Sequence, residues 1–157
     1  MKLKTRITRR NPDTLGKAGK IISTVSKLEA APEKCGEDCL RIVFETPFGT
    51  AGALYNLDSA RLSHLIESTG VNVAALDGDE YDLKDMIGRR AQILWAWQRG
   101  SRRGVFPKAL IAEPVTDDMP NYLPLTAEEW AVYDCDKTGM IRASSLPTSA
   151  TGDNAPF

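Results

Sequence analysis

The residues best suited to chemistry lie between positions 89 and 108, where cationic and large aromatic side chains are interspersed. They are Arg89, Arg90, Arg99, Arg102, Arg103 and Lys108, together with Trp95, Trp97 and Phe106. Cations neutralise phosphates and release their counterions, and flat aromatic faces stack on unpaired bases. This combination is typical of a surface that binds single-stranded nucleic acid, and Tyr55 is a further aromatic candidate for it.

The two tryptophans of this segment have a second interpretation. Trp95 and Trp97 share the more apolar face of one predicted strand with Ala91 and Ile93. Large aromatic side chains on such a face often belong to the core. Base stacking would then fall to whichever of the four aromatic residues faces solvent.

Residues for catalysis are sparse, so we expect no enzyme. The single histidine, His64, is expected to be an exposed residue of a helix, and no nucleophile-elbow, phosphate-loop, zinc-protease or dinucleotide-binding motif is present. Four acids cluster at Asp77, Asp79, Glu80 and Asp82 without an accompanying base. A solvated acidic loop is the favoured interpretation, and a metal-dependent nuclease is a third functional hypothesis.

Cysteine and aspartate spacing predicts neither a cofactor nor a metal centre. Cys35 and Cys39 are four residues apart, whereas a structural zinc site needs four ligands in close pairs, so free thiols in a reducing cytoplasm are expected. Asp134–Gly139 resembles half of a calcium loop, with Asp134, Asp136 and Thr138 at alternate positions. Its twelfth position is Ser145 rather than a bidentate Glu, which favours a turn with side-chain hydrogen bonds.

Composition and charge describe an ordinary globular chain with strongly alternating blocks. The 157 residues are 42% hydrophobic and 26% charged, and no apolar run is long enough to cross a membrane. Residues 1–20 hold seven basic residues against one acid, and residues 84–108 also hold seven against one. Residues 21–83 hold eleven acids against four basic residues, and residues 109–157 hold eight against two. The two basic blocks would suit a polyanion.

The elements that must position these residues are five strands and two helices. Strands are predicted over 16–28, 39–46, 50–57, 89–98 and 105–112, and the alternation of Leu40, Ile42 and Phe44 is the clearest signal. Asp58 is expected to cap a helix that stops at Gly70, and Pro107 predicts an edge or a bulge in the last strand. A capping box at Thr126–Glu129 opens the second helix.

This order predicts a mainly β protein with an OB-like five-stranded barrel (β-β-β-α-β-β). An SH3-like barrel or an α+β sandwich would produce the same order of elements. The expected organisation is a basic arm over 1–16, the barrel over 17–113, a Pro-containing linker with a short helix over 114–141, and a disordered tail over 142–157.

The last residues, Thr151-Gly152-Asp153-Asn154-Ala155-Pro156-Phe157, complete a family resemblance. The layout resembles phage and bacterial single-stranded DNA-binding proteins, which join an OB domain to a tail ending in acids and Phe. The segment Leu83–Arg90, before the fourth strand, is similar to the turn that enters this strand in phage-encoded OB-like proteins. The resemblance implies that Asp153, Pro156 and Phe157 recruit replication or repair proteins, although such tips usually carry several acids.

Two functional hypotheses follow from the sequence. The first is a cytoplasmic single-stranded nucleic-acid-binding protein, with DNA as the expected ligand, that acts without sequence preference in phage or bacterial replication or recombination. The second is an interaction or inhibitor protein whose acidic blocks at 29–82 and 113–136 target a basic host enzyme. Both exclude a membrane partner and leave a homo-oligomer open.

Overall fold

The computed structural model describes residues 3–4, 14–76, 78, 80–100 and 104–142. In chain order the elements are β1 (Gly19–Ala30), α1 (Pro32–Cys35), β2 (Cys39–Thr46), β3 (Gly49–Asn56), α2 (Ala60–Ser68), η1 (Val73–Ala75), η3 (Leu83–Met86), β4 (Arg90–Arg99), β5 (Val105–Glu113), β6 (Tyr122–Leu123) and α3 (Ala127–Val132). Five main strands with a helix between the third and fourth are confirmed. None of the helices in these ranges is long and apolar enough to cross a membrane.

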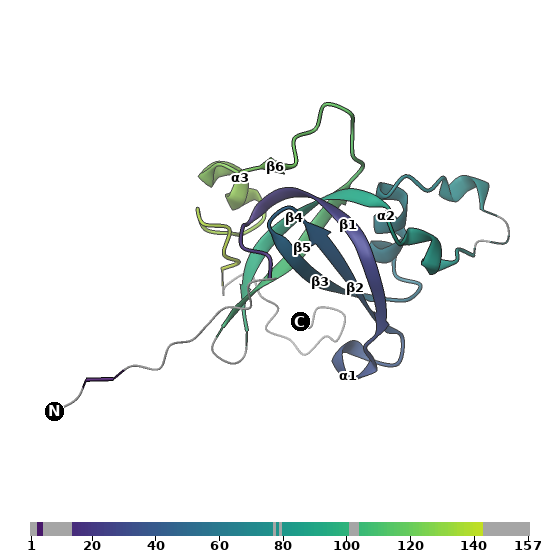
Figure 1. Cartoon of the computed structure of the whole chain (residues 1–157), viewed down its shortest axis with the longest axis horizontal. Helices are drawn as coiled ribbons and strands as arrows, with labels where there is room; N and C mark the ends of the chain where they lie inside the picture. Colours follow the sequence, from purple (N-terminus) through teal and green to yellow (C-terminus); the bar gives the residue numbers. More distant parts are fainter. Residues whose placement is uncertain (1–2, 5–13, 77, 79, 101–103, 143–157) are drawn as a thin grey trace.

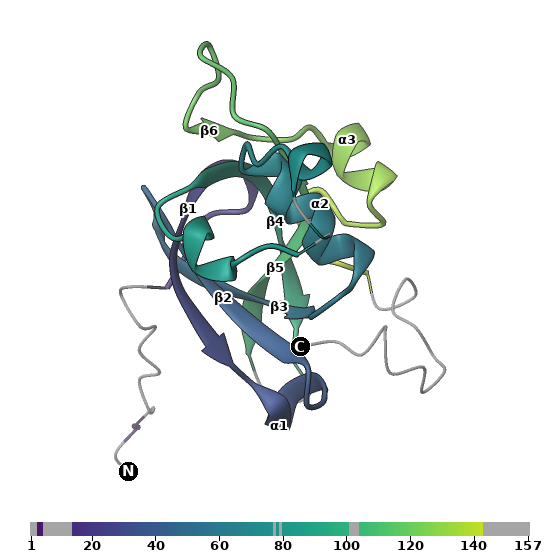
Figure 2. The same cartoon turned by 90° about the vertical axis from the view of Figure 1, so that its right-hand side faces the viewer.

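The strands form one antiparallel sheet in the order β3-β2-β1-β4-β5, with the short β6 paired to β1 (Figure 1). The protein is therefore mainly β, as predicted. The sheet curves until its outermost strands, β3 and β5, come close to each other (Figure 2). No ladder joins these two strands within the described ranges, so the sheet is not closed into the five-stranded barrel that the sequence predicts.

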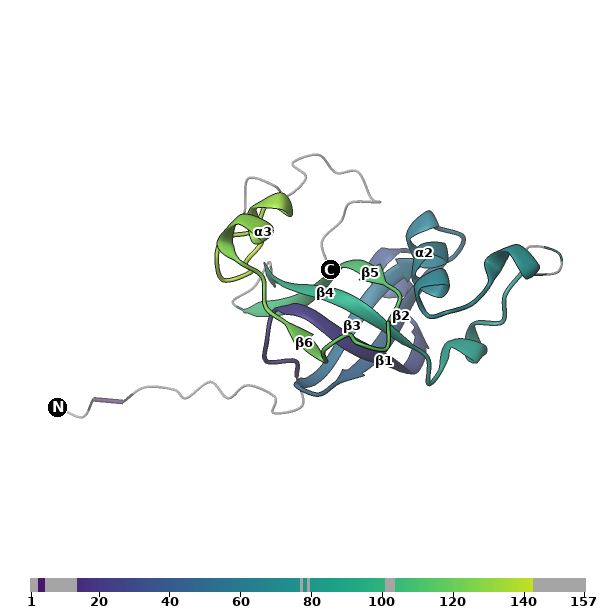
Figure 3. The same ribbon diagram turned by 90° about the horizontal axis from the view of Figure 1, so that it is seen from above.

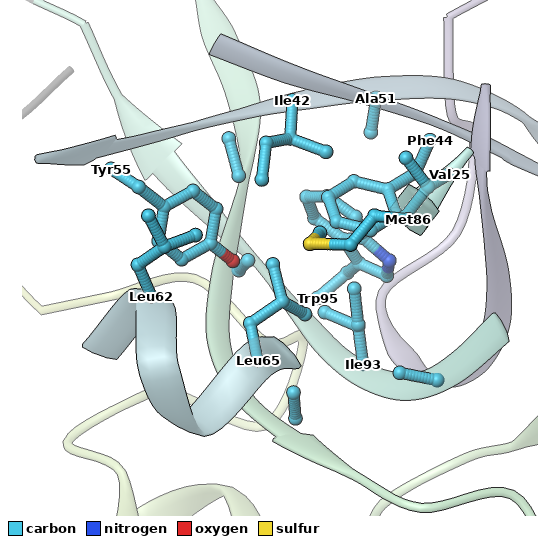
Figure 4. Packing of buried hydrophobic residues seen from close by; sticks show 14 of the residues in the cluster. Val25, Ile42, Phe44, Ala51, Tyr55, Leu62, Leu65, Met86, Ile93 and Trp95 are labelled. Atoms are coloured by element: carbon cyan, nitrogen blue, oxygen red, sulfur yellow. The ribbon is translucent and has the colours of Figure 1, made fainter. Parts of the chain in front are cut away.

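The inner face of the curved sheet holds the main core (Figure 4). Trp95 is fully buried there, packs edge-to-face on Phe44 with ring centroids 5.7 Å apart, and donates a hydrogen bond from Nε1 to Ser23 Oγ at 3.0 Å. Met86 from η3 and Leu65 from α2 cover the open end of this core. Trp95 therefore belongs to the core, which is the second of the two interpretations that the sequence allowed.

Residues 114–142 pack on the outer face of β4 and extend the sheet beside β1 (Figure 3). The predicted capping box of α3 is confirmed, with Thr126 and Glu129 exchanging side-chain and backbone hydrogen bonds. Trp130 of this helix is buried against Leu94 and Ala96, which explains why β4 is buried on both faces. The chain then runs beside β4, where the carbonyl of Gly139 accepts a hydrogen bond from Trp97 N at 2.7 Å.

Helix α2 begins one residue later than predicted. Ser59, not Asp58, is its N-cap, and Ser59 Oγ accepts from Leu62 N at 3.1 Å. Asp58 instead takes a φ of 64° in the preceding turn, a left-handed conformation that Asp tolerates. The predicted stop is confirmed, because Gly70 follows the C-cap with a φ of 95°.

The prediction that Cys35 and Cys39 are free thiols is wrong, because a disulfide joins them. Their Cα atoms are 5.2 Å apart, within the usual range for a bridged pair. Spacing alone missed this bond because the turn after α1 folds the chain back on itself. Cys135, which lies elsewhere, is a buried free thiol.

Candidate functional site

The site lies along the open seam between β3 and β5. Leu57 N donates to Asp38 O at 2.9 Å, which sets the alternation of the β2–β3 ladder. In an antiparallel ladder every second residue directs its N–H and C=O away from its partner. The backbone groups of Gly52 and Leu54 therefore point into the seam, whereas Thr50 O on the same edge accepts a hydrogen bond from Leu15 N at 2.7 Å.

Pro107 explains why strand pairing does not continue from β5 to β3 at this position in the seam. It lies opposite Trp97 in the β4–β5 ladder, and the Gly100 N–H bonded to Gly104 O sets the alternation that turns Pro107 toward β3. Proline has no N–H to donate across the gap. The prediction of an edge or a bulge is confirmed on both counts: β5 is an edge strand, and its register shifts opposite Leu94 and Trp95.

The far end of the seam is closed by side chains of α2 instead of a ladder. The Arg61 guanidinium donates to Leu54 O on β3 at 2.8 Å and to Ala109 O on β5 at 2.9 Å. It also lies over the Tyr55 ring, 4.5 Å from the centroid. His64 Nε2 bonds to Ala112 O at 2.8 Å, so α2 satisfies β5 carbonyls that a neighbouring strand would otherwise bind.

The part of the seam that stays open is a cleft of about 300 Å³, hereafter the β3–β5 cleft. The described residues that line it are Thr14, Lys34, Arg41, Thr50–Leu54, Arg61 and Phe106–Ala109. Four of these are cations and none is an acid, while Glu29 lies 4.0 Å from Arg41. The cleft therefore favours an anionic ligand.

Gly52 lines the β3–β5 cleft, and the backbone does not require a glycine there. Its φ is not positive, and the nearest atoms to a Cβ built at this position belong to the Arg41 side chain, from 3.4 Å. Glycine inside a strand is costly and often marks a close approach of a ligand or another backbone. A side chain at this position would take up space beside the cleft.

The environment of the cleft lowers the pKa of one of its cations, Lys108. Burial, and then the charge of Arg61, lower the pKa of Lys108 to about 8. A bound anion would favour the charged form of this ammonium group and raise its pKa again.

The predicted nucleic-acid-binding residues are not brought together as one surface. Phe106 and Lys108 line the β3–β5 cleft, while Trp95 and Tyr55 are buried and offer no ring face to a ligand. Trp97 is half-buried and forms an isolated β-bridge with Met140, and Arg99 is exposed at the end of β4. Arg102 and Arg103, like the tail residues Asp153, Pro156 and Phe157, lie outside the described residues.

Arg89 and Arg90 belong to a different hollow at the start of β4. Arg89 forms an ion pair with Asp85 at 2.9 Å, and Asp117 also lines this hollow. Arg90 precedes Ala96, the β4 residue that pairs with Lys108 of the cleft, by roughly 20 Å of strand at about 3.3 Å per residue. The two arginines therefore do not contribute to the β3–β5 cleft.

Four residues of the cleft were not predicted from the sequence, namely Lys34, Arg41, Gly52 and Arg61. Three of the four basic residues in the acidic block 21–83 line the cleft. The local sequence signal that could have indicated the cleft is Gly52, a glycine within an otherwise regular strand pattern.

The remaining acidic motifs are engaged in turns or lie outside the described ranges. Asp136 Oδ1 accepts from Thr138 N at 2.8 Å and Met140 N at 3.2 Å, in agreement with the side-chain-bonded turn. Asp77 and Asp79 are not among the described residues. Within the described ranges, no three His, Cys, Asp or Glu side chains gather as metal ligands.

No protein-family model matches the chain, and no curated protein matches it significantly. The geometry and charge of the β3–β5 cleft are therefore the observations that bear on function.

Proposed function

We propose that the protein binds single-stranded nucleic acid, with DNA as the expected ligand, in the β3–β5 cleft. The observation that carries this proposal is the convergence of Lys34, Arg41, Arg61 and Lys108 beside Gly52, with no acid among the described residues of the lining. Phosphates would be neutralised by the three cations other than Arg61, whose guanidinium is already bonded to two carbonyls. Contacts of this kind read the backbone rather than the base sequence.

The aromatic side chain of the cleft supports a single strand over a duplex. Among the described lining residues Phe106 is the aromatic one, and it needs an unpaired base to stack on. A role in phage or bacterial DNA replication or recombination, with recruitment of replication or repair proteins by the C-terminal tail, is part of this proposal and is supported by the sequence resemblance.

A titration of a labelled oligo-dT of about thirty nucleotides, followed by fluorescence anisotropy, tests the proposal. The label belongs on the DNA because none of the three tryptophans lines the cleft. Three engaged cations predict a slope of about −2 for log affinity against log salt, at about −0.7 per neutralised phosphate. A duplex of equal length is the control and should bind more weakly.

Absence of binding at low salt would reject the nucleic-acid ligand. Capture of a basic host enzyme through the acidic blocks would then be the hypothesis to pursue.

The affinity is expected to fall as the pH rises from about 7 to about 9. Lys108 is charged below its pKa of about 8 and neutral above it, and only the charged form attracts a phosphate. A loss of roughly threefold to tenfold is expected, since one such contact contributes about 1 kcal/mol. Lys108→Arg is the matched variant, because guanidinium stays charged throughout; its affinity should not change over this range. An equal pH dependence in both proteins would exclude Lys108 as its source.

A further inference from the structure

The disulfide between Cys35 and Cys39 lies next to the β3–β5 cleft. It joins the last residue of α1 to the first residue of β2, and α1 lies where the β1–β2 connection turns (Figure 1). Lys34, the residue before Cys35, is one of the cations that line the cleft. A bond that holds α1 in place therefore also holds a ligand-facing charge in place.

Besides the disulfide, backbone hydrogen bonds hold α1 at its ends, from Ala31 N to Cys39 O and from Cys39 N to Gly36 O, both at 2.9 Å. This helix is a single helical turn of four residues, it buries none of them, and its N-cap residue, Ala31, makes no side-chain capping bond. Isolated turns of this length are not stable in water. Ala31 and Cys39 are buried in a small satellite core with Leu54, against which Cys35 packs. The helix is thus anchored at its two ends, and the disulfide is the covalent anchor.

The bond is accessible from one side. Cys35 is half-buried, whereas Cys39 is only 3% exposed, so a thiolate from solution can reach Cys35 Sγ first. Breaking the bond leaves the sheet pairing intact, because Cys39 remains paired with Asn56 in the β2–β3 ladder. A loop of so few residues also contributes little to the stability of the whole domain.

We propose that Cys35 and Cys39 form a reversible dithiol–disulfide site whose oxidised state holds Lys34 at the cleft and strengthens the binding of single-stranded nucleic acid. This inference rests on the proposed function. The oxidant is a small disulfide of the glutathione class. The Cys35 thiolate displaces one thiolate from it, the Cys39 thiolate then attacks Cys35 Sγ and displaces the second, and two thiols are formed as the protein disulfide forms. Reduction by a dithiol reverses both displacements.

The test compares the oxidised full chain with the chain reduced by dithiothreitol, using the labelled oligo-dT. Reduction should weaken the affinity about threefold to tenfold, the effect of one phosphate contact. Cys35→Ser/Cys39→Ser should bind like the reduced protein without any reductant. Lys34→Ala should bind more weakly in both states and lose the dependence on redox state. Cys135 does not interfere, because it is fully buried and unreactive.

A second measurement follows α1 without any nucleic acid. Trypsin cleavage after Lys34 should be several times faster in the reduced protein, while cleavage after Lys27, which lies within β1, should be unchanged and serves as the internal control. Equal cleavage at Lys34 in both states would overturn the positional role of the disulfide. If cleavage responds to reduction but neither state binds oligo-dT, the nucleic-acid proposal fails while the redox-dependent positioning of α1 stands. If both states bind equally, the regulatory inference is overturned and the nucleic-acid proposal stands.

Discussion

Gly52→Thr is expected to weaken the binding of oligo-dT about 30-fold to 100-fold, a loss of about 2–3 kcal/mol. The new side chain would extend from a lining residue of the β3–β5 cleft, beside the Arg41 side chain. A ligand that lies against β3 at this position would clash with it, while the cations around the cleft remain present.

The same substitution should leave the fold intact or stabilise it. Gly52 does not have a positive φ, and its nearest neighbour for a new Cβ is a flexible side chain at an ordinary contact distance. Replacing a strand glycine with a β-branched residue is worth about 0.5–1 kcal/mol. A variant that unfolds at higher denaturant concentration yet binds poorly would identify Gly52 as a residue kept for the ligand.

Anisotropy titration and urea unfolding of the same preparations decide this prediction. Asn56→Thr is the matched control, because Asn56 lies on the same strand and points the same way but does not line the cleft. The control should keep wild-type affinity. Unchanged affinity in Gly52→Thr would show that the ligand binds elsewhere on the molecule.

Arg61→Met is expected to lower the free energy of unfolding by about 2 kcal/mol, because two carbonyls lose a charged donor. The guanidinium bridges Leu54 O and Ala109 O and covers the buried ring of Tyr55. No ladder joins β3 to β5 within the described ranges, so this side chain joins the two edges where strand pairing does not. Methionine preserves the contact with the ring but donates nothing.

Urea unfolding checks this prediction with two further variants. Arg61→Lys should recover only part of the loss, because one ammonium cannot present the planar fork that reaches both carbonyls. Ser63→Ala, on the exposed side of the same helix, controls for a general effect on α2. A loss below about 0.5 kcal/mol in Arg61→Met, the size of an ordinary surface substitution, would show that the bridge is not needed to hold the seam.

Much of the secondary structure is predictable because its signals are local. The alternation of Leu40, Ile42 and Phe44 indicates a strand with one buried face, and β2 occupies the predicted range. The Thr126 capping box needs only residues within one helical turn, and it forms as predicted. Pro107 marks an edge because a missing donor is a property of that residue alone.

The candidate site is much less predictable because its parts are far apart in the chain. Phe106 and Lys108 come from the basic segment that the sequence highlights, but Lys34 and Arg41 come from a block dominated by acids. Trp95, the most suggestive aromatic residue, is instead the centre of the core. The identity of a side chain does not reveal which face of the curved sheet it occupies.

The strands, the capping box of α3 and the interruption at Pro107 could be predicted from the sequence, because each depends on the chemistry of neighbouring residues. The place where the charges meet could not, because it depends on the three-dimensional arrangement of the strands. Neighbouring side chains on a strand point to opposite faces, so the average charge of a segment does not predict the charge of the surface it forms. Curvature of the sheet brings β3 against β5, Arg61 joins one end of the seam, and cations from three distant elements surround the end that stays open.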